Sequence, residues 1–124
     1  MAGTIVANTI NTDAGLFSTQ NAYQGIAKAW VNFNGVTTAT IRSSFNVSSI
    51  TRTSTGIYTV NFTTALPDTN YCALNCAGGT ASVVGGVSYE NVTARTTSSF
   101  TFYTYNTSFV FADAAYCNIA IFSA

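Results

Sequence analysis

The chain has 124 residues, of which only 6% are charged, and it contains no histidine. Four basic residues balance four acidic ones, so no basic stripe is available to hold a nucleic-acid backbone, and no run of 18 apolar residues predicts a membrane-spanning helix. Thr, Ser and Asn, with 21, 12 and 12 residues, take the place of charge. This composition disfavours proton transfer, metal binding and phosphate chemistry, and it suits contacts with protein or sugar.

The beginning of the chain differs from the rest. Residues 1–24 contain few aromatic side chains and show no clean periodicity after residue 10. We interpret them as an N-terminal arm, with a strand over 4–10 and a linker over 11–24; a first strand followed by a long loop fits the pattern equally well. The start lacks the basic region and apolar run of a secretory signal, so we expect no export by that route. Residues 25–124 are expected to form a single β-sandwich domain.

Residues 27–33 alternate strictly between apolar and other side chains, which predicts a strand with Trp30 on its second face. Asn34-Gly35 follows and predicts a two-residue type I′ hairpin turn, after which residues 36–42 return as the partner strand. The residues on the first face of this strand are Ala27, Ala29, Val31 and Phe33.

Two more strands are expected before the single proline. In residues 45–51, Phe45 and Val47 share one side, and Ile50 interrupts the alternation, which indicates a bulge or a strand end. Residues 57–63 alternate cleanly after a turn that ends at Gly56. Their inward residues are expected to be Tyr58, Val60 and Phe62.

The second half of the chain contains further segments whose pattern predicts short strands. Residues 71–76 predict a strand, and the glycine pairs after it indicate a loop or irregular edge over 77–86. Segments 87–95 and 98–105 read as an antiparallel pair, and 116–122 as a final strand. About eight or nine short strands at regular spacing predict an all-β fold, an antiparallel β-sandwich or a jelly-roll-like domain.

Three cysteines, Cys72, Cys76 and Cys117, cannot fill a four-ligand zinc site in a chain without histidine. An odd count also argues against a closed disulfide framework. Because Cys72, Leu74 and Cys76 share one face of their strand, we expect buried free thiols, and we expect no metal and no cofactor.

Catalytic groups are scarce. Asp68 and Asp113 fall in predicted turns, where aspartate is a common turn-former, and Glu90 falls in a predicted strand. Nothing in their spacing selects a carboxylate pair, and a serine or cysteine nucleophile lacks a histidine base. We therefore expect that the protein is not an enzyme.

Exposed aromatic side chains are the candidate binding residues. Trp30, Tyr103 and Tyr105 are expected on the second faces of their strands, away from the core formed by residues such as Phe100 and Phe102. Tyr and Trp are enriched at protein interfaces, and they also stack on sugar rings. We expect an interface or a second core face, with a glycan-stacking site as the alternative.

Three sequence blocks carry a resemblance to a known family: AKAWVNFNG at 27–35, ATIRSSFNVSSI at 39–50 and TGIYTVNFTTALPDTNY at 55–71. Together with the leading MAGTIVANT, they resemble a family of small bacteriophage proteins that is common in phages of marine and freshwater bacteria, cyanophages among them. The resemblance covers residues 1–71, whereas 72–124 are similar only in style. The blocks contain no catalytic motif.

The resemblance implies a structural component of the virion, made in the host cytoplasm. The sequence starts at a methionine and contains neither coiled-coil heptads nor collagen-like repeats for a shaft, so we expect a capsid decoration (cement) protein. Its expected partners are copies of itself, with a homotrimer favoured, and the major capsid protein. The alternative is a tail-fibre tip that recognises a host surface glycan; neither interpretation involves nucleic acid or membrane.

Overall fold

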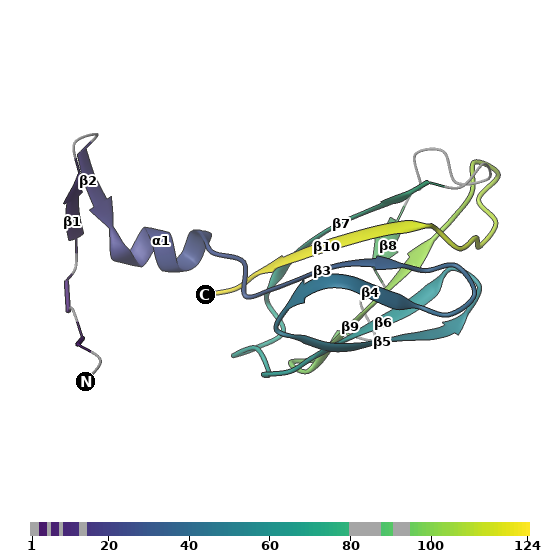
Figure 1. Ribbon diagram of the computed structural model, residues 1–124, viewed down its shortest axis with the longest axis horizontal. Coiled ribbons are helices and arrows are strands. Elements are labelled where there is room, and N and C mark those ends of the chain that lie inside the picture. Colours follow the sequence, from purple (N-terminus) through teal and green to yellow (C-terminus); the bar gives the residue numbers. More distant parts are fainter. Residues whose placement is uncertain (1–2, 5, 8, 13–14, 80–87, 91–94) are drawn as a thin grey trace.

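The computed structural model describes residues 3–4, 6–7, 9–12, 15–79, 88–90 and 95–124, and it shows an all-β protein whose two antiparallel sheets pack as a sandwich (Figure 1). The predicted β-sandwich is therefore confirmed. The first sheet has the strand order β4-β3-β10-β7. Its strands are β3 (Ala29–Asn34), β4 (Thr40–Phe45), β7 (Cys72–Gly78) and β10 (Tyr116–Phe122).

The second sheet has the strand order β5-β6-β9-β8. Hairpins join β5 to β6 and β8 to β9 in this sheet, just as one joins β3 to β4 in the first. The pair expected from 87–95 and 98–105 is found over its described part, as an antiparallel ladder between Ser88–Glu90 and Phe102–Thr104. The strand expected over 57–63 pairs with both β5 and β9. The strands are β5 (Val47–Ser54), β6 (Ile57–Phe62), β8 (Ser88–Glu90) and β9 (Ser99–Thr104).

The core lies between the sheets and follows the alternation of the sequence. Side chains at every second position of β3, β6 and β10 are buried, as predicted. Its centre is aromatic: Phe33 meets Tyr58 edge-on with ring centroids 5.3 Å apart, and Phe100 stacks with Phe102 at 6.0 Å. Such pairs add about 1 kcal/mol each beyond the area that they bury. The two sheets are therefore joined by ring contacts across the sandwich.

The turn between β3 and β4 differs from the prediction. A type I′ turn needs a positive φ at both central residues, but the left-handed residue of this loop is Thr37, at φ 60°, and β4 begins only at Thr40. Gly35 is needed for space instead, because a Cβ there would lie 2.5 Å from the hydroxyl oxygen of Tyr58. The Asn34-Gly35 signal was wrong because a core contact, and not turn geometry, requires the glycine.

Asn46 turns the chain from one sheet to the other. It has φ 54°, and its amide donates to the carbonyls of Lys28 (3.0 Å) and Thr64 (3.1 Å). This corner places Phe45 in the first sheet and Val47 in the second, so the two do not continue one strand as expected. The irregularity anticipated near Ile50 is present, since the ladder between β5 and β6 shifts register between Val47 and Ser49.

The arm contains more regular structure than the sequence indicated. Strands β1 (Thr9–Thr12) and β2 (Gly15–Ser18) form a hairpin, and α1 (Thr19–Gly25) connects it to the sandwich. Neither the second strand nor the helix was expected in a segment interpreted as a linker. In Figure 1 the hairpin stands away from the sandwich, with α1 between them.

Two expectations extend beyond the described residues. The loop predicted over 77–86 begins later than expected, because β7 continues to Gly78, and residues 80–86 of this loop lie outside the part of the chain that the structure describes. The same holds for residues 91–94, which belong to the strand expected over 87–95. No described helix is long and apolar enough to cross a membrane.

Candidate functional site

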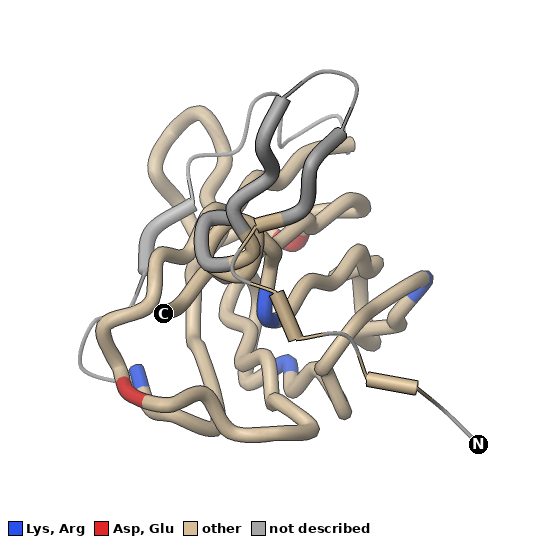
Figure 2. Tube along the Cα trace, turned by 90° about the vertical axis from the view of Figure 1, so that its left-hand side faces the viewer, with Lys and Arg blue, Asp and Glu red and all other residues tan. Residues whose placement is uncertain are grey.

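The basic side chains that the structure describes contact other groups of the protein. Arg42 lies over the ring of Tyr116, at 4.5 Å from the centroid, and its Nη2 donates to the carbonyl of Ala115 at 2.7 Å. Lys28 Nζ lies 3.2 Å from the centroid of the Tyr23 ring, and the guanidinium of Arg95 lies 4.3 Å from that of Tyr71. Charged residues are also widely scattered along the chain (Figure 2). The surfaces between them are consequently built from uncharged groups.

A polar cluster is centred on Asp113, which precedes β10. Its carboxylate accepts hydrogen bonds from Arg52 Nη2 at 2.7 Å, from the Gly56 amide at 2.9 Å and from the Tyr58 hydroxyl at 2.7 Å. The Tyr58 hydroxyl also lies 3.0 Å from the Gly35 carbonyl, but it has one proton, and the nearer, charged oxygen is the better acceptor. Asp113 thereby ties the β5–β6 turn to the loop before β10.

The electrostatics of this cluster fit a structural role. Partial burial opposes ionisation of Asp113, but the hydrogen bonds from Arg52, Gly56 and Tyr58 outweigh it and lower the pKa of the carboxyl to about 2. Burial, and then the neighbouring carboxylate, raise the pKa of Tyr58. A carboxylate held ionised by three donor groups is a poor general base near neutral pH.

Of the other two carboxylates that the sequence offered, the structure describes the side chain of one. Asp68 accepts a hydrogen bond from the amide of Asn70 at 2.7 Å, which makes it the turn-former that was expected. Glu90 ends β8, and its side chain lies outside the described part of the structure. No group of three potential metal ligands occurs among the described residues.

The prediction of buried thiols is right for one cysteine and wrong for two. Cys117 is buried in β10, and this burial raises the pKa of its thiol to about 12. Cys72, Leu74 and Cys76 do share one face of β7, but that face points to solvent, and Leu74 is 58% exposed. The inward positions of β7 hold the small residue Ala73, then Asn75 and Ala77, so the alternation was correct and the choice of face was not.

Trp30, Tyr103 and Tyr105 do not form one site. Trp30 points outward from β3 in the first sheet and is 39% exposed. Tyr103 belongs to β9 of the second sheet, where it contacts Tyr105 edge-on with ring centroids 6.5 Å apart. The structure therefore separates the three candidate residues into two surfaces on different sheets.

The first surface, the outer face, is a row of side chains across the first sheet. Ladder pairing brings Phe45, Trp30, Ala120 and Leu74 into line, one from each strand. A parallel row contains Asn32 and its hydrogen-bonded partner Asn118, followed by Cys76. The two rows enclose a hollow of about 360 Å³. The outer face is thus apolar along one row and amide-rich along the next.

The second surface, the apex loop, comprises residues 106–110. The Asn106 side chain accepts hydrogen bonds from the amides of Ser108 (2.9 Å) and Val110 (3.0 Å), which fixes the loop. Phe109 sits at its end with φ 58° and is 67% exposed. Phe111, which directly follows the apex loop, stacks on Tyr105 with ring centroids 4.7 Å apart. Sequence reasoning missed Phe109 and Phe111, although an aromatic pair among turn residues was a usable signal.

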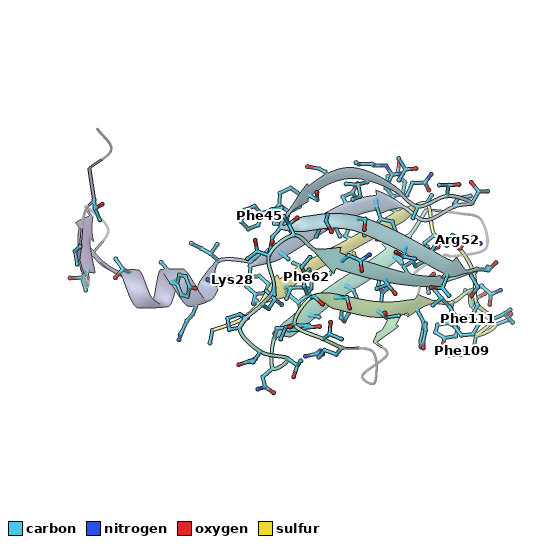
Figure 3. All side chains as sticks on the ribbon, turned by 90° about the horizontal axis from the view of Figure 1, so that it is seen from below. Lys28, Phe45, Arg52, Phe62, Phe109 and Phe111 are labelled. Carbon is cyan, nitrogen blue, oxygen red and sulfur yellow. The ribbon has the colours of Figure 1, made fainter. Side chains whose placement is uncertain are left out.

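The third surface, the basal groove, lies where the arm joins the sandwich. Tyr23 and Ile26 line it from the arm, and Phe45, Leu66 and Pro67 line it from the sandwich; its volume is about 680 Å³. Lys28 and Phe45 lie at this end of the molecule, whereas Phe109 and Phe111 lie at the opposite end (Figure 3). The molecule therefore presents an arm and a groove at one end and exposed aromatic rings at the other.

Comparison of the chain with protein-family models, with curated proteins and with solved structures finds no match.

Proposed function

We propose that the protein is a structural component of a bacteriophage particle, and specifically a decoration protein that stabilises the capsid shell through contacts between subunits. The observation that carries this proposal is the combination of an arm at one end with uncharged, apolar surfaces on the sandwich. The sequence blocks in residues 1–71 that resemble small phage proteins support it.

The mechanism is passive. A protein that binds only the assembled shell stabilises that shell by mass action, without any chemical step. Apolar residues such as Trp30, Phe45 and Leu74 supply surface to bury, at about 25 cal/mol per Å² removed from water. Neither nucleic acid nor membrane is needed for this role.

Immunogold labelling of virions with an antibody against this protein tests the proposal. We expect label over the whole head, and we expect the purified protein to bind expanded capsids. A parallel experiment with a Trp30→Ser, Leu74→Ser double variant should show weaker binding. Label absent from the head, together with no capsid binding by the wild-type protein, would contradict the proposal.

A tail-fibre tip that binds host surface glycan is the second candidate, and the apex loop favours it. Phe109 and Phe111 are exposed at the end of the molecule that is farthest from the arm, where a receptor could reach them. Exposed aromatic rings beside hydroxyl side chains such as Ser108 suit stacking on sugar. Label at the tail, and loss of host-cell binding in Phe109→Ser, would favour this function over capsid decoration.

A further inference from the structure

We infer that the arm of one copy docks in the basal groove of a second copy, so that the protein assembles head-to-tail. The inference deepens the proposed function, and it rests on that function for the expectation that copies meet on a particle. The two halves of the contact are the arm segment that precedes α1 and the groove lined by Phe45, Leu66 and Pro67.

The arm cannot be stable by its own interactions. Its hairpin has two strands of four residues each, and its helix has seven residues. An isolated two-stranded hairpin is marginally stable at best in water, and isolated helices shorter than about 12 residues are marginal as well. These elements therefore need a covering surface, and in Figure 1 the hairpin stands away from its own sandwich.

The basal groove has the matching shape and chemistry. Its volume of about 680 Å³ accommodates several side chains, and much of its lining is apolar. Phe45 is 53% exposed there, and Tyr23 and Ile26 are also exposed. The cationic group of Lys28, which lines the groove too, is already held by the carbonyl oxygen and ring of Tyr23. The groove thus calls for an uncharged, apolar occupant.

The arm itself is such an occupant. Residues 1–24 carry a single charge, at Asp13, and include the aliphatic residues Ile5, Val6, Ile10 and Leu16. Val6 is 93% exposed in the single chain. The arm of a second copy is therefore a nearly uncharged, partly apolar segment, which matches the groove.

Arm and groove are different surfaces, so the contact between copies is heterologous. A heterologous contact closes into a ring when its rotation permits, and each copy then gives one arm and receives another. This arrangement covers the hairpin and fills the groove in every subunit. A ring of this kind is compatible with the homotrimer that the family resemblance implies.

Sedimentation velocity of the full chain over a range of concentrations tests the inference. We expect an oligomer for the wild-type protein, and at least about a tenfold weaker association for Phe45→Ser, because this change removes an aromatic side chain from the groove. Phe109→Ser is the matched control, since it also removes an exposed phenylalanine but at the opposite end of the molecule. A wild-type monomer at all concentrations, or equal weakening by both variants, would overturn the inference.

A mixing experiment separates arm exchange from a face-to-face contact. Val6→Asp impairs the arm and Phe45→Ser impairs the groove, so in a head-to-tail contact the two variants complement each other at one interface. At a concentration where the wild-type protein is oligomeric and each variant alone is mainly monomeric, we expect the mixture to contain a one-to-one dimer. No dimer in the mixture would exclude the arm–groove contact.

Circular dichroism of each variant confirms that the sandwich is folded. Because neither experiment uses virions or capsids, a monomer on sedimentation refutes the arm exchange, whereas absence of label on the virion refutes the proposed function.

Discussion

Asp113 shows how one carboxylate can organise several loops. It receives hydrogen bonds from a guanidinium, a backbone amide and a phenol that come from the β5–β6 hairpin. The sequence indicated only that Asp113 lies in a turn. It could not show that Arg52, 61 positions earlier in the chain, pairs with it, because that contact depends on how the sheets pack.

Replacing Asp113 by Asn should lower the free energy of unfolding by about 2 kcal/mol, the usual cost of losing hydrogen bonds to a charged group. Because the folded-state pKa of Asp113 is about 2, below the value of about 3.9 in unfolded chains, its contribution is complete above about pH 5 and is lost as the pH falls from there to below about 2. Urea denaturation from neutral to acid pH measures both effects. Asp68→Asn is the control; an equal loss of stability there would contradict the assignment.

Gly56 is the position where backbone conformation limits substitution most. It has φ 69°, and an added Cβ would lie 2.5 Å from the Thr104 carbonyl and 2.8 Å from the Ala112 amide nitrogen, both backbone atoms. We expect Gly56→Ala to reduce the free energy of unfolding by at least about 2 kcal/mol, through strain and overpacking. Gly25→Ala, which would contact nothing within 4 Å, should have little effect in the same denaturation experiment.

At the scale of single elements, alternation in the sequence located most strands but did not always identify their faces. In β3, β6 and β10 the alternating residues predicted to face inward are the buried ones, so pattern and burial agree. In β7 the apolar Leu74 points outward, and the residues that pack against the core are the small Ala73 and Ala77. The sequence could not reveal this, because the bulk needed at each inward position is set by the aromatic rings of the opposite sheet.

The orientation of β7 predicts how its cysteines react. In the native protein a maleimide should modify Cys72 and Cys76 but not Cys117, which is buried and has a raised pKa. Mass spectrometry should therefore show two additions under native conditions and three in denaturant. A third addition at the native-state rate would contradict the burial of Cys117.

At the scale of the whole molecule, the low charge content shapes both solubility and association. The sandwich architecture followed from strand spacing, but the sequence left the choice between sandwich and jelly roll open, because strand order depends on long-range pairing. The sequence indicated the arm as a separate segment, but it did not indicate the basal groove. Residues that are far apart in the sequence, such as Tyr23, Pro67 and Ser123, line this groove.

Association through uncharged surfaces should respond weakly to salt. Screening weakens contacts between exposed charges, but the groove and the arm offer few such charges to screen. We expect the association constant to change by less than about twofold between low and high ionic strength. Sedimentation in both buffers measures it, and a strong decrease in salt would indicate an electrostatic interface instead.

The exposed cysteines of β7 also determine which disulfides form when air oxidises the protein. Four residues of strand separate Cys72 from Cys76 by about 13 Å, which exceeds the Cα separation that a disulfide can span. Neither thiol can therefore close on the other within one molecule. Oxidation instead joins separate molecules, and two reactive positions per chain allow covalent polymers to grow, which a non-reducing gel would display as a ladder.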